Sequence, residues 1–348
     1  MKKALQQLPT YAKRTYRGGK LLRSFLYEEN ASDDFYPEDW ITSFTEAKNR
    51  EYVKNEGISR VITESGEMLI TEAVKNEDFG EGRADSGVLI KLLDAAERLG
   101  IQVHPTKAYA KKYFNSDYGK TECWYVLGTR EDSDEKACIY LGFKEYVTKE
   151  LWKELFEKQD LNGMLAAMHR FEVKAGDVIL VTGGTPHAIG AGCFLLEIQE
   201  PSDYTMRVEK TTVAGEQLTP KQIHYGVGEE AMLDCFEMLP MSENGIKERF
   251  FLKGSVGENG EIRLVSYDDT VCFALSLVDG GHYRAQEKSF VTVVALDNGG
   301  TLKVNGDSYD LRRGDRFFVP AGSETELKDA KAVICYPPKK GKLRGENV

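Results

Sequence analysis

The segment VKAGDVILVTGGTPHAI (Val173–Ile189) shares its pattern with LRRGDRFFVPAGSETEL (Leu311–Leu327). In both, two residues separate an apolar residue from a Gly-Asp pair, four mostly apolar residues follow, and a loop with a further glycine comes next. The Gly-Asp pair predicts a tight turn into a buried strand, and the later glycine allows a second turn. We therefore expect a faint internal repeat of β-structure. At the position of His187, the second copy has Glu326 or its neighbour, and no histidine lies nearby. Only the first copy could therefore hold a metal through imidazole.

Short runs of β-branched and aromatic residues recur along the chain, bounded by Gly, Asp, Asn or Pro. Such runs are typical of many short strands, and they predict a mainly β protein built as a barrel or sandwich. The expected strands are Ile101–His104, Cys123–Leu127, Ala137–Phe143, Arg170–Val173, Val178–Val181, Cys193–Gln199 and Thr205–Val208.

A few segments read differently. After Thr148, an expected N-cap, apolar residues recur on one helical face and predict a surface helix within about residues 148–168. A second helix is expected at Gly228–Glu237, after an extended stretch at Gln222–Tyr225. The charged, glycine-rich segment Met241–Gly260 is expected to be a linker or a crossing strand with loops. These assignments predict domains at residues 1–240 and 241–348.

Length and composition narrow the function. A chain of 348 residues suggests about two domains. Its 56 acidic and 46 basic side chains give a formal net charge of −10, so nucleic acid is not an expected partner, and a small anionic substrate would need a local cluster of Lys and Arg. The six cysteines show no CxxC pair and are expected to be reduced thiols. No apolar run resembles a signal peptide or a membrane span, so we expect a cytoplasmic protein without a membrane partner. Its oligomeric state stays open between monomer and weak dimer.

Two histidines, a glutamate and a glutamine are candidates for a metal site. Strand alternation puts Gln102 and His104 on one face, and it puts Lys120 and Glu122 together on a face of a neighbouring strand. His187 follows the loop TGGTP. Two imidazoles, one carboxylate and an amide oxygen match a mixed site for a divalent metal such as zinc. The alternatives are that the histidines are hydrogen-bonded structural residues and that Glu122 is a rim carboxylate paired with Lys120.

The other histidines and two neighbouring cysteines show no such convergence. His169, His224 and His282 are interpreted as structural residues, and Cys123 and Cys193 as core residues.

Four ordered motifs stand out: IQVHP (Ile101–Pro105), GKTECWYVLG (Gly119–Gly128), GTPHAIGAG (Gly184–Gly192) and LLEIQEPSDYTMRV (Leu195–Val208). Together they resemble the type I mannose-6-phosphate isomerase (phosphomannose isomerase) family of double-cupin enzymes, and LIKLLDAAERL (Leu89–Leu99) also matches that family's pattern. The resemblance implies two cupin (jelly-roll) barrels with a few short helices, of which only the first binds metal. Two N-terminal segments depart from the family pattern: Arg17 replaces the tryptophan of a Trp-Gly-Gly motif, and Glu38–Asn49 follows the pocket-lining segment only loosely.

The resemblance also implies roles for single residues. It implies that one zinc ion per chain is held by Gln102, His104, Glu122 and His187. Arg207 matches the family's active-site arginine, Lys120 the lysine beside the metal-binding carboxylate, and Glu197 the acidic residue ten positions before the arginine. The implied reaction interconverts mannose 6-phosphate and fructose 6-phosphate through an enediol, with a small phosphorylated hexose as substrate. Glu197 is expected to carry the proton, with a metal-bound water as the alternative. Whether Lys120, Arg207 or the divergent N-terminal segment takes the phosphate stays open.

Two other functions compete with the isomerase. A cupin oxygenase is one, because two histidines and a carboxylate also form the facial site of non-haem iron enzymes. Gln102 as a fourth ligand and the phosphate-suited Arg and Lys argue against it. A non-catalytic sugar-phosphate sensor is the other, suggested by the altered N-terminal motifs. For Arg207 itself, the alternative is an exposed strand arginine paired with Glu209 or Asp203.

Overall fold

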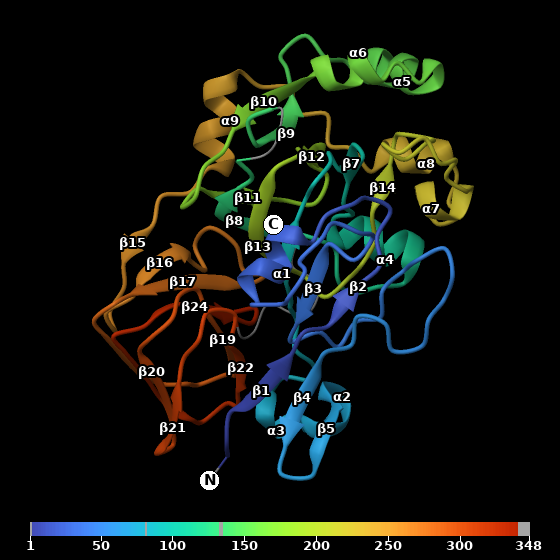
Figure 1. Cartoon of the computed structure of the whole chain (residues 1–348). Helices are drawn as coiled ribbons and strands as arrows, with labels where there is room; N and C mark the ends of the chain where they lie inside the picture. The colour runs from blue at the N-terminus through green and yellow to red at the C-terminus, as the bar shows by residue number, and fades with distance from the viewer. Residues whose placement is uncertain (1, 81, 132–134, 340–348) are drawn as a thin grey trace.

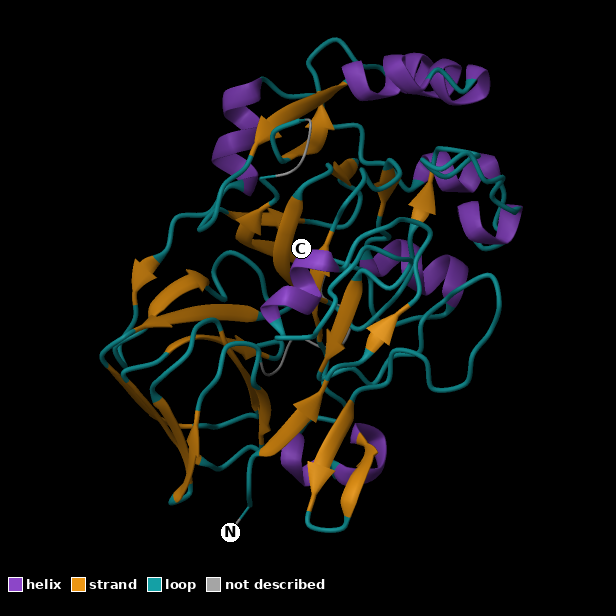
Figure 2. Cartoon of the chain, viewed as in Figure 1, coloured by secondary structure: helices purple, strands orange, loops and turns teal. Residues whose placement is uncertain are grey.

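A computed structural model describes residues 2–80, 82–131 and 135–339, and this part of the chain is mainly β, as expected (Figure 1). Its strands form four sheets, and every strand pair in them is antiparallel. Most of the short helices lie toward the outside of the molecule (Figure 2).

Two sheets belong mainly to the first two thirds of the chain. The six-stranded sheet has the order β11 (Val178–Val181), β8 (Glu122–Thr129), β13 (Cys193–Gln199), β6 (Leu89–Asp94), β3 (Glu38–Ile41), β2 (Tyr11–Ala12). The five-stranded sheet has the order β10 (Met168–Glu172), β9 (Cys138–Phe143), β12 (His187–Ile189), β7 (Gln102–Val103), β14 (Met206–Arg207).

The other two sheets contain the C-terminal strands. The nine-stranded sheet has the order β15 (Ser255–Val256), β16 (Ile262–Val265), β17 (Ala274–Asp279), β24 (Lys331–Tyr336), β19 (Val291–Ala295), β22 (Arg316–Val319), β1 (Leu5–Leu8), β4 (Arg60–Thr63), β5 (Gly66–Leu69). The four-stranded sheet has the order β18 (His282–Gln286), β23 (Glu324–Lys328), β20 (Thr301–Val304), β21 (Asp307–Asp310). The N-terminal strand β1 therefore joins a sheet whose other central strands come from the end of the chain.

The four sheets stack in layers with apolar cores between them. Strand alternation sends Leu92 into the core shared with the nine-stranded sheet and its neighbour Leu93 into the core shared with the five-stranded sheet. Cys123 and Trp124 divide between the same two cores. A further core separates the nine-stranded and four-stranded sheets. The six-stranded sheet is therefore buried on both faces, which explains why its strands read as continuous apolar runs.

The repeat seen in the sequence has a structural counterpart at the two Gly-Asp turns. In the first turn, Asp177 Oδ2 accepts from the backbone N–H of Lys174 at 2.9 Å. In the second, Asp315 Oδ2 accepts from the backbone N–H of Arg312 at 2.8 Å. The glycine before each aspartate has a positive φ, 93° and 87° respectively, which favours glycine because it lacks a Cβ. The strands that follow, β11 and β22, pair with β8 and β19 in corresponding ways.

The helices of the described residues are α1 (Lys20–Phe25), α2 (Ile70–Ala73), α3 (Asn76–Phe79), α4 (Lys107–Phe114), α5 (Lys149–Lys158), α6 (Leu161–Ala166), α7 (Pro220–His224), α8 (Glu229–Asp234) and α9 (Glu243–Phe250). The sequence analysis assigned two of them, α7 and α9, wrongly. The surface helix expected after Thr148 is α5 followed by α6, and Thr148 accepts from the backbone N–H of Leu151 as its N-cap. The segment expected to be extended before the second helix is α7, and the expected linker contains α9. No helix in the described ranges is long and apolar enough to cross a membrane.

Candidate active site and metal centre

One row of side chains crosses the six-stranded sheet at the site. Trp40 on β3 lies directly opposite Lys91 on β6, Lys91 lies opposite Glu197 on β13, and Glu197 lies opposite Trp124 on β8. Directly opposed residues of antiparallel strands have side chains on the same face, within contact distance. The Lys91 ammonium accordingly lies 3.0 Å from Glu197 Oε1. Strand register thus brings together residues that lie far apart in the sequence.

A second row crosses the five-stranded sheet. Gln102 on β7 lies opposite His187 on β12 on one side and opposite Arg207 on β14 on the other. The indole ring of Trp124 meets the imidazole of His187 edge-on, with ring centroids 5.5 Å apart. The two rows therefore face each other across the space between the two sheets.

The loop before His187 packs closely on the segment that carries His104. The backbone N–H of Gly184 donates to the carbonyl of His104 at 2.8 Å. A Cβ at Gly183 would lie 2.7 Å from the carbonyl oxygen of Pro105, closer than real Cβ atoms approach. The glycines of TGGTP are therefore needed so that this loop can bring His187 next to His104.

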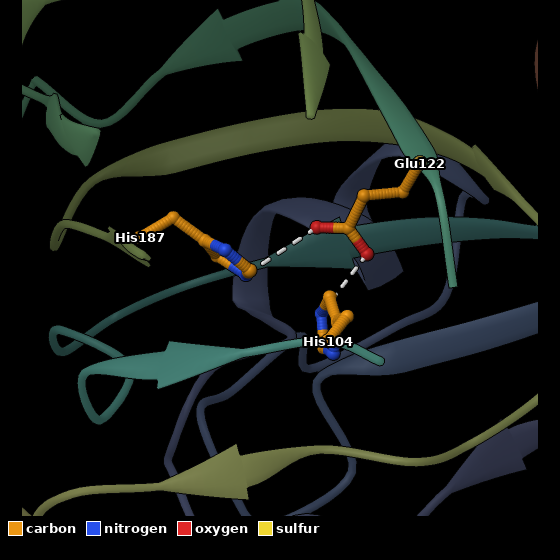
Figure 3. Close-up of side chains that lie close together, drawn as sticks. All are labelled: His104, Glu122 and His187. Atoms are coloured by element: carbon orange, nitrogen blue, oxygen red, sulfur yellow. Dashed lines mark ion pairs between the residues drawn. The ribbon is translucent and has the colours of Figure 1, made fainter. Parts of the chain in front are cut away.

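His104, Glu122 and His187 point toward one another from three different segments (Figure 3). Glu122 Oε2 lies 3.2 Å from His104 Nε2, and Glu122 Oε1 lies 3.5 Å from His187 Nε2. The amide of Gln102 adds a fourth group, with its Nε2 3.1 Å from His187 Nε2. All four side chains are buried, and at 1% exposure Glu122 is not the rim carboxylate of the alternative interpretation.

Hydrogen bonds fix the tautomer of both imidazoles. His104 Nδ1 lies 2.9 Å from the carbonyl oxygen of Tyr204, and His187 Nδ1 lies 2.9 Å from that of Thr185. A carbonyl oxygen only accepts, so each Nδ1 carries the proton and each Nε2 presents a lone pair. Burial is the main reason that the pKa of His104 falls to about 3 and that the pKa of His187 also falls. Both rings are therefore neutral, which is the form that binds a metal.

The donor spacing fits a tetrahedral zinc ion. Zinc bonds to nitrogen and oxygen of about 2.0 to 2.2 Å place adjacent donor atoms of a tetrahedron about 3.3 to 3.6 Å apart. The 3.1, 3.2 and 3.5 Å separations among the side chains of Gln102, His104, Glu122 and His187 are close to this range, and one ligand atom from each of the two histidines and Glu122 lies within 4.8 Å of the others. A half-turn of the Gln102 amide puts Oε1 in place of Nε2, because the two are interchangeable in shape. The residues present therefore suit the metal that the sequence motifs imply.

Lys120 lies beside the carboxylate of this cluster. Its ammonium is 2.8 Å from Glu122 Oε2 and 2.7 Å from His104 Nε2. Burial alone would raise the pKa of Glu122, but the charge of the Lys120 ammonium lowers it well below its ordinary range. Glu122 is therefore ionised, as a metal-binding carboxylate must be.

Glu197 belongs to a buried charge network that the sequence analysis did not identify. Lys91 lies between Glu197 and Glu38, 3.0 and 3.6 Å from the nearest carboxylate oxygens. Glu38 also accepts from Arg14 Nε at 2.8 Å and from Tyr16 Oη at 2.7 Å. A signal was present in the sequence, since Lys91 interrupts the apolar run LIKLLD, in which every residue is buried. Burial raises the pKa of Glu197, opposed by the charge of Lys91.

Arg207 has no carboxylate partner among the described residues. Its Nη1 donates to the carbonyl oxygens of Gln222 at 2.7 Å and Thr205 at 3.3 Å. The two partners of the alternative interpretation are engaged elsewhere: Glu209 pairs with Arg98 at 2.6 Å and Asp203 with Arg14 at 3.3 Å. The guanidinium charge is therefore available to a ligand.

A cavity of about 320 Å³ connects these groups. Gln102, Lys120, Glu197 and Arg207 line it, together with Lys91. This volume is within the range of small-ligand sites. The expected catalytic residues and the edge of the metal cluster thus open onto one space.

The remaining histidines and the cysteines lie outside this cluster. His169 Nε2 is 2.9 Å from the carbonyl oxygen of Met241, His224 Nδ1 accepts from the backbone N–H of Gly226, and His282 pairs with Glu326. All six cysteines are buried and unpaired.

Comparison with known proteins gives consistent matches. The family model described as "Phosphomannose isomerase type I, catalytic domain" matches residues 6–126. The "Probable mannose-6-phosphate isomerase GmuF" of Bacillus subtilis is 31% identical over 254 residues, which cover 72% of this chain and 75% of that protein. The "Mannose-6-phosphate isomerase" of Streptococcus mutans is 30% identical over 249 residues, 71% of this chain and 73% of that protein.

Solved structures share the fold over nearly the whole chain. The mannose 6-phosphate isomerase from Bacillus subtilis has a TM-score of 0.75 and 24% identity, covering 96% of this chain and 99% of that one. A mannose 6-phosphate isomerase described as holo and zinc bound has a TM-score of 0.73 and 16% identity, covering 97% of this chain and 100% of that one.

Proposed function

The chain belongs to the type I mannose-6-phosphate isomerase family, and from this premise we propose that it is a zinc-dependent isomerase that interconverts mannose 6-phosphate and fructose 6-phosphate. The observation that carries the proposal is the row His187–Gln102–Arg207, in which Gln102 lies between a second expected metal ligand and a guanidinium without a carboxylate partner, and Gln102 and Arg207 both line the cavity.

We assign the zinc to Gln102, His104, Glu122 and His187. Their donor spacing, the neutral imidazoles and the ionised carboxylate support this assignment. When bound, zinc supplies Lewis-acid stabilisation of negative charge on a substrate oxygen. The Nδ1 hydrogen bonds of both histidines to backbone carbonyls hold the rings in the orientation that this requires.

Glu197 is our candidate for the group that moves the proton between C1 and C2 of the sugar. Its carboxylate is buried and lines the cavity, and burial raises its pKa. A carboxyl group with a raised pKa exchanges protons near neutral pH more readily than an ordinary glutamate does. Lys91, held by Glu38 on its other side, fixes the position of the Glu197 carboxylate.

Arg207 and Lys120 supply the positive charge in this scheme. The Arg207 guanidinium, oriented by the carbonyl of Gln222, can donate to an enediolate oxygen through its planar fork. Lys120 places a point charge next to Glu122 at the inner wall. Both act on charge that grows in the transition state, which is where electrostatic stabilisation accelerates a reaction.

We propose that the fold consists of two cupin barrels, at residues 1–240 and 241–348, with the metal site in the first. The matching Gly-Asp turns before β11 and β22 support this, because each has the same aspartate hydrogen bond and leads into a strand that pairs antiparallel with an earlier strand of the same segment of the chain. The six unpaired cysteines support a reducing compartment, for which we propose the cytoplasm.

A coupled assay tests the function. Zinc-loaded protein is incubated with mannose 6-phosphate, and the formation of fructose 6-phosphate is followed. Free mannose and other phosphorylated aldoses are tested as alternative substrates, and a sample treated with a chelator serves as the zinc-free control. We expect turnover of mannose 6-phosphate that disappears on chelation and returns with zinc. Tight binding of the sugar phosphate without turnover would indicate a sensor instead, and oxygen uptake with bound iron would indicate an oxygenase.

A further inference from the structure

Apart from Arg207, the cations that line the cavity fall into two groups. Those at the inner wall are already paired: Arg14 Nε lies 2.8 Å from Glu38, Lys91 Nζ lies 3.0 Å from Glu197, and Lys120 lies against Glu122. All three cations are at least mostly buried, and their charges are balanced within the protein.

The cations at the mouth are not paired. Lys48, Arg50 and Lys221 are exposed and line the same cavity, and no salt bridge joins any of them to another described residue. The Lys48 ammonium lies 4.8 Å from the ring centroid of Tyr204 and is thereby held at the wall. Two carboxylates line this side of the cavity as well. Glu46 Oε1 already accepts from Tyr52 Oη and from the backbone N–H of Asn55, and Asp203 pairs with Arg14.

The loop of Lys48 and the helix of Lys221 are fastened to the same segment. The backbone N–H of Lys48 donates to Asp203 Oδ2 at 2.7 Å. On the other side, Arg207 Nη1 donates to the carbonyl of Gln222, the residue after Lys221, and Tyr225 Oη donates to the carbonyl of Asp203 at 2.9 Å. The two lysines are therefore brought to the Asp203–Arg207 segment by separate sets of bonds.

This arrangement concentrates positive charge against an acidic background. The whole chain carries a formal charge of −10, which repels anions in general. On this side of the cavity, the three cations of Lys48, Arg50 and Lys221 outnumber the carboxylates of Glu46 and Asp203, of which Asp203 is already paired with Arg14. A dianionic group is therefore attracted to this wall of the cavity more than to the acidic surface around it.

We propose that Lys48 and Lys221, with Arg50, form the binding site for the phosphate group of the substrate. This rests on the proposed function, and it adds the orientation of the substrate. The reacting carbons lie at the buried end, where Gln102 and Glu197 line the cavity and are 9% and 3% exposed, and the phosphate lies at the exposed end. Ammonium groups suit a phosphate that keeps part of its hydration, since they act as point charges.

The double variant Lys48→Ala/Lys221→Ala tests the site. We expect the KM for mannose 6-phosphate to rise at least about tenfold, kcat to change by less than about threefold, and the selectivity for mannose 6-phosphate over free mannose to fall at least about tenfold. The matched control is Lys253→Ala, an exposed lysine outside the cavity, which should behave as wild type. Lys48→Arg/Lys221→Arg, which keeps both charges, should recover most of the affinity.

Inorganic phosphate provides a readout that does not require turnover. Its binding to the zinc-loaded protein, measured by calorimetry, should weaken at least about tenfold in the double variant and remain unchanged in Lys253→Ala. Equal phosphate affinity and equal KM in the wild type and the double variant would overturn the site, even if isomerase activity is present. Lysine-dependent phosphate binding in a wild type that isomerises no sugar would instead overturn the function and leave the anion site standing.

Discussion

Arg207 is the cavity-lining cation whose charge is both unpaired and next to the metal cluster. Its guanidinium is oriented by the carbonyls of Gln222 and Thr205, and it lies beside Gln102 across the β7–β14 pair. A carbonyl oxygen orients the guanidinium group but carries no charge that would neutralise it, so the positive charge of Arg207 remains available to the substrate.

Replacing Arg207 should therefore separate metal binding from catalysis. We expect Arg207→Ala to keep its zinc and to lose at least about a hundredfold in kcat/KM, because it lacks a transition-state charge partner. Metal analysis and the coupled assay on the same sample measure the two quantities. Unchanged turnover would remove Arg207 from the mechanism.

Glu38 should contribute stability that depends on pH. Burial alone would raise its pKa, but Arg14 and Lys91 lower it well below the ordinary value. A carboxyl group whose pKa is lowered by folding stabilises the folded state above its unfolded pKa, about 4.3, and this contribution is lost as the pH falls toward the folded pKa. Glu38→Gln should therefore cost about 3 kcal/mol at pH 7 and less at pH 4.

Urea unfolding at the two pH values checks this, with the wild type measured in parallel so that other acid-sensitive groups cancel. A destabilisation by Glu38→Gln that is the same at pH 7 and pH 4 would show that the charge of Glu38 does not stabilise the network.

At the scale of elements, the TGGTP loop decides whether the two histidines meet. A Cβ at Gly183 would meet the backbone of Pro105 and Thr106, which cannot move aside as a side chain can. Gly183→Ala should thus displace His187 and reduce zinc content at least about tenfold while the fold remains. The matched control is Gly128→Ala on β8, where a Cβ meets no atom within 4 Å. Metal analysis with circular dichroism measures both effects, and full zinc content in Gly183→Ala would contradict the account.

The sequence predicted the parts of the site that lie in local motifs, and it missed those that depend on strand register. His104, Glu122 and His187 sit in short segments whose alternation can be read directly. The contact of Lys91 with Glu38 and Glu197, by contrast, follows from the pairing of β3, β6 and β13. That pairing joins segments about fifty and a hundred positions apart, which no local pattern encodes.

The two misassigned helices had readable signals. In α7, Thr219 caps the helix, Pro220 occupies its first turn, and Gln222 completes a capping box. In α9, Ser242 is the N-cap, and Ile246 and Phe250 share one buried face at a spacing of four residues. The charged residues between Ile246 and Phe250 made the segment look like a polar linker in the sequence.

At the scale of the whole molecule, the two halves share one core. Leu275 and Phe318 of the nine-stranded sheet pack in the same cluster as Ile90 and Leu196 of the six-stranded sheet. A buried ion pair also joins Arg316 to Asp39, with 3.2 Å between the nearest atoms. The parts of the chain on the two sides of the boundary proposed at residue 240 therefore cover each other across this core.

Fragment 1–240 should accordingly not fold stably alone, because it would expose the apolar face that the C-terminal strands cover. The full chain should unfold in a single calorimetric transition. Circular dichroism and scanning calorimetry measure both, and a stable, cooperatively folded fragment 1–240 would contradict the shared core.

The most direct test of the zinc-isomerase account is a parallel measurement of zinc per chain and mannose 6-phosphate turnover in wild type, His104→Ala and His187→Ala. We predict one zinc and steady isomerisation in the wild type, and the joint loss of both in each variant. One zinc per chain together with undiminished turnover in the two variants would contradict it.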